Sequence, residues 1–120
     1  MRLAAAVLIV LVAALHIYFL VVEMFLWRTP FGRRTFGTTV EGADSSAVLA
    51  ANQGLYNGFL AAGLLWGLMW YGVVGGRPII TFFLLCVVAA GVYGGLTVSR
   101  RILVVQAAPA AIAGALLWLS

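Results

Sequence analysis

The chain has 120 residues, of which 65% are hydrophobic and only 8% are charged, and its formal net charge is +4. A soluble domain is about half apolar and about a quarter charged, so these proportions exclude a soluble domain and a disordered tail. One cysteine also excludes a disulfide scaffold. Because a spanning helix needs about 20 apolar residues, we expect an all-α protein, a four-transmembrane-helix bundle forming a single integral membrane domain over residues 1–120.

Four apolar runs follow one another along the chain. The first is too long for the apolar segment of a signal peptide. A polar loop over residues 28–45 separates it from the second run, for which Asp44 or Ser45 is the expected N-cap. The predicted spans cover about residues 3–27, 46–73, 79–98 and 101–119.

The fourth run contains a proline that should interrupt the helix. Pro109 has no amide hydrogen and cannot bond to the carbonyl of Val105. We therefore expect a kink beside Gln106.

The arginines lie at the ends of the apolar runs, where they direct membrane topology, so the positive charge does not indicate a nucleic-acid partner. Five flank the first and third loops, namely Arg28, Arg33, Arg34, Arg100 and Arg101. Two flank the opposite face, Arg2 and Arg77. Since cytoplasmic loops carry the excess of basic residues, the count predicts cytoplasmic first and third loops and both termini outside.

Three pairs of glycines are spaced four residues apart, as in helices that approach one another closely in lipid. They are Gly54 and Gly58, Gly63 and Gly67, and Gly91 and Gly95. We favour packing between helices of one chain. Formation of a homo-oligomer, or docking on a larger membrane complex, is the alternative.

Two ionisable residues lie within the first span, where a charge is costly. His16 and Glu23 are seven residues apart, so they lie within about 20° of each other on the helix and about 10.5 Å apart along its axis. That separation excludes a direct hydrogen bond. They are the candidate catalytic residues, with His16 as general acid/base.

Amides and phenols of the other spans lie at similar depths when counted from the cytoplasmic ends. Asn52 and Gln53 are predicted level with Glu23, and Asn57 level with His16. The expected ligand-binding residues are His16, Glu23, Asn52, Gln53, Tyr56, Asn57, Tyr93 and Gln106. With one histidine and one cysteine, a monomer cannot build a zinc site, and the sequence leaves any cofactor open.

Two segments carry a family resemblance. The first span contains LHIYF at residues 15–19 and EMFLW at residues 23–27, and the second contains AANQGLYNGFLAAGL at residues 50–64. In these motifs the chain resembles the small bacterial membrane proteins grouped as domain of unknown function 1304. The resemblance implies a four-span protein of the bacterial inner (plasma) membrane and no established activity.

A looser likeness is to the membrane-associated enzymes of eicosanoid and glutathione metabolism, around residues 52–65. Those enzymes pair an arginine and a glutamate with the asparagine of their second helix. Here Val48 and Leu55 occupy these spacings, so glutathione conjugation is unsupported.

Three functions remain open from the sequence. The polar pocket in the cytoplasmic half could bind a lipid-like or quinone-like molecule, or the chain could be an accessory subunit of a membrane complex. Alternatively, His16 and Glu23 could perform acid–base chemistry on an apolar, isoprenoid-like substrate. A proton-coupled transporter, which would require an oligomer, is the third possibility.

Overall fold

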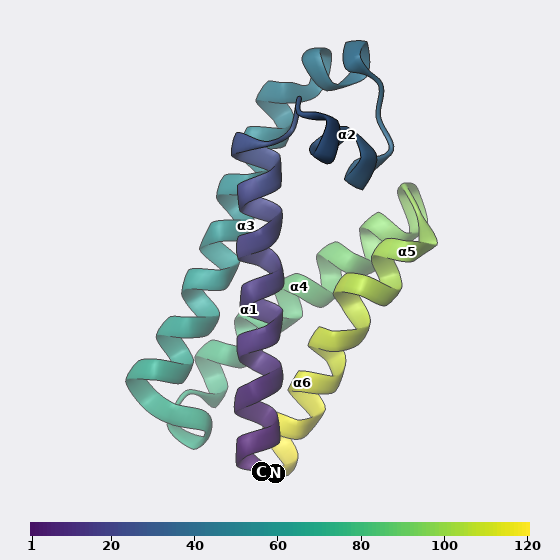
Figure 1. The fold of residues 1–120 in the computed structure, drawn as a ribbon. Coiled ribbons are helices and arrows are strands. Elements are labelled where there is room, and N and C mark those ends of the chain that lie inside the picture. Colours follow the sequence, from purple (N-terminus) through teal and green to yellow (C-terminus); the bar gives the residue numbers. More distant parts are fainter. The chain divides into compact units, whose positions relative to one another are not determined.

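The computed structural model describes all 120 residues, and every regular element in it is helical (Figure 1). In chain order the elements are α1 (Arg2–Phe25), α2 (Pro30–Phe36), α3 (Val40–Gly75), α4 (Arg77–Thr97), α5 (Arg100–Ile102), the π-helix η1 (Leu103–Ala107) and α6 (Ala108–Leu119). Four segments are long and apolar enough to cross a membrane, namely Arg2–Phe25, Val40–Gly75, Arg77–Thr97 and Arg100–Leu119. The predicted all-α class with four spanning helices is therefore confirmed.

The chain divides into two compact units, which we describe separately. The four-helix unit comprises Met1–Ala14 and Leu60–Ser120, and the hairpin unit comprises Leu15–Phe59. Both α1 and α3 contribute one half to each unit.

The four-helix unit has a core of aliphatic side chains and alanines from α1, α3, α4 and α6. Its buried members are Ile9, Val12, Ala13, Ala61, Leu64, Ile80, Leu84, Val87, Ala110, Ala113 and Leu117. Two of the glycine pairs predicted from the sequence lie at its helix contacts. A Cβ on Gly67 would approach Ile80 of α4 to 2.8 Å, and one on Gly91 would approach the backbone nitrogen of Ala107 to 2.6 Å. These glycines therefore serve packing within the chain.

The fourth spanning segment contains the interruption that Pro109 predicts. The amide of Ala108 donates to the carbonyl of Leu103, five residues earlier, so the turn before the proline is a π-helix. Pro109 occupies the first turn of α6, where its missing amide hydrogen costs least. Gln106 lies in η1, three residues before Pro109.

The hairpin unit differs from the prediction in the segment between the first two spans. The structure forms α2 there, and α3 begins at Val40 instead of near Ser46. The predicted cap at Asp44 or Ser45 is wrong. The hydroxyl of Thr39 accepts from the amide of Gly42 at 3.0 Å and performs that role.

A threonine–proline pair starts α2. Thr29 accepts from the amide of Gly32 at 3.2 Å, and Pro30 follows as the first helical residue, the position that proline favours. Gly37, at φ 65°, ends the helix in the left-handed conformation. Gly32 faces the carbonyls of Leu26 and Trp27 so closely that no Cβ would fit, which seats α2 directly against the end of α1.

Candidate functional site

The site begins where α1 and α3 run side by side within the hairpin unit (Figure 1). Gly54 has no side chain to hold the two helices apart. A Cβ there would lie 2.6 Å from Cγ of Met24 and 3.2 Å from the carbonyl oxygen of Leu20. A Cβ on Gly58 would approach Cδ1 of Leu20 to 2.6 Å. The first of the predicted glycine pairs thus allows the backbone of α3 to approach α1.

Glu23 is brought to this contact and is bound there by an amide. Its side chain is buried, with 6% of its surface exposed. Nδ2 of Asn57 donates to Oε1 of Glu23 at 2.5 Å. This bond joins residues 34 positions apart in the sequence. The second carboxyl oxygen of Glu23 and the second amide hydrogen of Asn57 remain for a ligand.

The pairing corrects the predicted levels, which placed Asn52 and Gln53 opposite Glu23 and Asn57 opposite His16. The Cβ of Glu23 lies beside Gly54, next to Gln53, so the backbone level is close to the predicted one. The partner is decided by the side chains, which lean toward the N-terminus of their own helix. In an antiparallel pair the side chains of Glu23 and Asn57 therefore lean toward each other.

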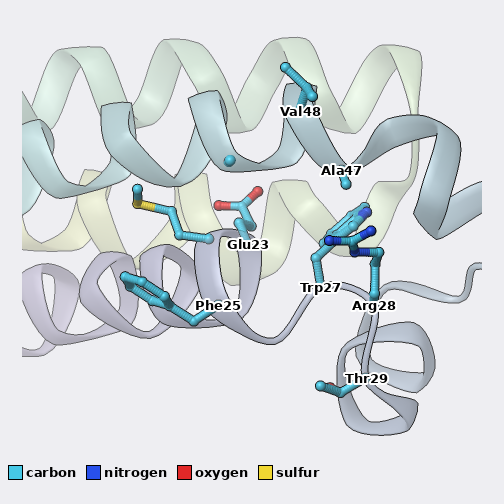
Figure 2. Close-up of a pocket in the computed structure, with 9 residues that line it drawn as sticks. Glu23, Phe25, Trp27, Arg28, Thr29, Ala47 and Val48 are labelled. Carbon is cyan, nitrogen blue, oxygen red and sulfur yellow. The ribbon is translucent and has the colours of Figure 1, made fainter.

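Glu23 lines a recess of about 460 Å³ at the end of α1 (Figure 2). Its walls are Met24, Phe25, Trp27, Arg28, Thr29, Ala47, Val48 and Ala51. In Figure 2 the carboxyl of Glu23 points toward α3, while Trp27 and Arg28 lie together beyond the last turn of α1. The recess therefore combines a buried carboxyl, several apolar side chains and an exposed cation.

The cation at the rim is weakly held. Nη1 of Arg28 lies 3.9 Å from Oδ1 of Asp44, and their side chains are 68% and 59% exposed. An exposed ion pair of this kind contributes about 0–1 kcal/mol. An anionic group could therefore replace Asp44 at low cost.

A second recess, of about 570 Å³, contains three of the other predicted residues. Asn52, Gln53 and Tyr56 line it together with Trp27, Ser46, Leu49 and Ala50. Trp27 belongs to both recesses, and its Nε1 donates to the hydroxyl of Ser46 at 3.1 Å. The predicted pocket is therefore divided: Glu23 lies in the first recess, and Asn52, Gln53 and Tyr56 lie in the second.

His16 is completely buried, with 0% of its surface exposed, and its ring packs edge-on against Phe19 at a centroid distance of 5.5 Å. A substrate cannot reach the imidazole in this conformation. Tyr93 on α4, whose side chain is exposed, and Gln106 in η1 belong to the four-helix unit. Nowhere do three His, Cys, Asp or Glu side chains gather into a set that could hold a metal ion.

Sequence reasoning missed Trp27, Arg28 and Thr29 as residues of the site, because it assigned Trp27 to the end of the first span, Arg28 to topology and Thr29 to a loop. Their signal was the pair Thr29–Pro30, a helix start directly after the first span. A second helix so close to the end of the first makes the chain turn sharply there, and that turn forms the rim of the recess.

Comparisons with known proteins support the family predicted from the motifs. Residues 10–118 match the family described as "Protein of unknown function (DUF1304)". The chain is also similar to "Uncharacterized protein YpaA" of Lactococcus lactis subsp. lactis (strain IL1403), with 28% identity over 108 residues, which is 88% of this chain and 89% of that protein. No solved structure gives a significant match. The chain belongs to the DUF1304 family.

Proposed function

We propose that the chain is a multi-pass protein of the bacterial inner membrane that binds a lipid-like amphiphile in the Glu23 recess. The observation that carries this proposal is the buried carboxyl of Glu23, held by Asn57 in a recess that Arg28 also lines. A site with two different polar ends and apolar walls fits a molecule with two polar groups and an acyl or isoprenoid chain.

The side of the membrane follows from the arginines. Arg28, Arg33 and Arg34 all lie in the hairpin unit near the rim. By the positive-inside rule they support a cytoplasmic location for that end, with both termini outside. The ligand would then enter from the cytoplasmic leaflet, where anionic lipids lie.

The polar groups of the ligand follow from the two ends of the recess. Arg28 would bind a phosphate or carboxylate in place of Asp44. The free oxygen of the Glu23 carboxyl would accept a hydrogen bond from a hydroxyl lying deeper than that anion, and Met24, Phe25 and Val48 would contact the chain. A monoacyl lipid phosphate with a free glycerol hydroxyl has this arrangement.

Binding is favoured over the acid–base reaction because His16 has no exposed surface and so cannot touch a ligand in the recess. Catalysis by His16 and Glu23, proton-coupled transport and an accessory role stay predictions. The binding proposal differs from catalysis and from transport in requiring Arg28 but not His16.

The test is a lipid titration followed by native mass spectrometry, with three probes. They are 1-oleoyl lysophosphatidate, which has a phosphate and a free hydroxyl, dioleoyl phosphatidate, which lacks the hydroxyl, and monooleoylglycerol, which lacks the phosphate. We expect lysophosphatidate to bind most tightly. Glu23→Leu should weaken lysophosphatidate binding about tenfold and so remove its advantage over phosphatidate. Arg28→Gln should weaken it by a similar factor and remove its advantage over monooleoylglycerol.

Arg100→Gln is the matched control, because it removes the same charge from a residue outside the recess. If it weakens lysophosphatidate as much as Arg28→Gln does, the rim has no specific role. Equal binding of all three probes, or recovery of a bound quinone from the native membrane, would contradict the proposed ligand class.

A further inference from the structure

The outward face of α3 in the hairpin unit has a regular 3–4 spacing of exposed residues. Moving along the helix, these are Ser45, Leu49, Asn52, Tyr56 and Phe59. Leu49 is 70% exposed, Tyr56 62% and Phe59 55%. Alternating steps of four and three residues keep side chains on one stripe of a helix, as in the seam of a left-handed coiled coil. We call these five residues the α3 seam.

The seam lies on the opposite face of α3 from the contact with α1. At 100° per residue, its centre is roughly 160° around the helix from Gly54 and Gly58, which face Leu20, Glu23 and Met24. Packing against α1 therefore leaves the seam uncovered within the hairpin unit.

If Trp27 marks the membrane interface, the polar groups on this seam lie in the hydrocarbon region, where lipid cannot satisfy them. Trp27 follows the end of α1 and bonds to Ser46, and indoles of this kind mark the membrane interface. Asn52 is six residues further along α3 and Tyr56 ten, about 9 and 15 Å deeper. An amide without a hydrogen-bond partner in hydrocarbon is costly, and neither Asn52 nor the adjacent Gln53 makes a side-chain hydrogen bond within the chain.

From these observations we propose that the α3 seam is the interface with a second copy of the chain. An amide both donates and accepts, so the same residue on another copy satisfies it. Copies inserted in the same orientation and related by a two-fold axis along the membrane normal place identical residues at identical depth. Asn52 then meets Asn52 at the centre of the seam, where a polar residue fixes register and oligomeric state.

This interface differs from the one that the glycine pairs suggested from the sequence. Gly54 and Gly58 face α1, while Gly67 and Gly91 face α4 and η1 within their own unit. The second recess, between the seam and Trp27, gives a side chain of the partner a place to insert. The Glu23 recess has a different lining, so this proposal does not depend on the proposed ligand.

Cysteine cross-linking in the native membrane tests the interface. In a background in which Cys86 is replaced by Ala, Asn52→Cys and Tyr56→Cys should each give disulfide-linked dimers on mild oxidation, because a residue at a two-fold axis meets its own copy within disulfide range. Val21→Cys is the matched control, since Val21 is exposed on α1 in the same unit. Cross-linking at position 52 no stronger than at position 21 would overturn the proposal.

A second measurement uses the association of the intact chain in detergent or nanodiscs. Asn52→Leu should weaken dimerisation about 3- to 20-fold, whereas Val21→Leu should leave it unchanged. A wild-type chain that is monomeric in nanodiscs would refute the interface. A monomer that carries a lipid on this face would refute it as well.

Discussion

The hydrogen bond between Glu23 and Asn57 should couple the two residues energetically. In Asn57→Leu the carboxyl of Glu23, 6% exposed, loses the amide that donates to it at 2.5 Å. Leaving a buried polar group without its hydrogen-bond partner costs about 1–3 kcal/mol. We expect Asn57→Leu to lower the free energy of unfolding by about 2–3 kcal/mol. Glu23→Gln should cost less than about 1 kcal/mol, because its side-chain oxygen still accepts.

A double-mutant cycle measures this coupling directly. Unfolding of the wild type, Glu23→Leu, Asn57→Leu and the double variant would be followed in mixed micelles by reversible denaturation. The double variant should be more stable than the sum of the single changes predicts, by at least about 1 kcal/mol, because neither polar group is then left without its partner. Single changes that add to within about 0.5 kcal/mol would show that the bond does not stabilise the hairpin unit.

Two further predictions concern packing and the opposite end of the chain. Gly54→Ala places a Cβ 2.6 Å from Met24 and should lower the free energy of unfolding by about 1–3 kcal/mol. At Gly114 the nearest atom to an added Cβ is 3.9 Å away, so Gly114→Ala should leave the free energy of unfolding unchanged or raise it by up to about 1 kcal/mol. Equal effects in thermal unfolding would contradict the close helix contact. Arg77 donates from Nε to the carbonyl of Leu117 at 3.3 Å and lies 5.6 Å from the ring centroid of Trp118. Arg77→Met should therefore lower the free energy of unfolding by about 1–2 kcal/mol, and an unchanged value would show that these contacts add nothing.

Several features of the site could be predicted from the sequence because they depend on local composition. The apolar runs predicted four spans, and Glu23 stood out as a carboxyl inside one of them. The partner of Glu23 could not be predicted in the same way. Its identity depends on the direction in which side chains lean and on how closely Gly54 lets α3 approach α1. The second is a contact between residues about 30 positions apart.

The segment between the first two spans shows a different kind of error. The polar loop expected over residues 28–45 contains Pro30, Gly32 and Gly37, which begin, pack and end α2. Proline and glycine interrupt a helix when they lie in its interior, but they favour its start and its end when they lie at the termini. The cap at Thr29 was the local signal that distinguishes the two cases.

The sequence by itself determined that the chain is all-helical and has four apolar segments able to span a membrane, because hydrophobicity and run length are properties of each segment alone. It also indicated that a carboxyl and several amides lie where hydrocarbon cannot solvate them. Only the tertiary structure decided that Asn57 binds Glu23, that the other amides lie in a separate recess, and that the glycine pairs face neighbouring helices. These features depend on the register between helices. Contacts between residues far apart in the sequence set that register, so no single segment encodes it.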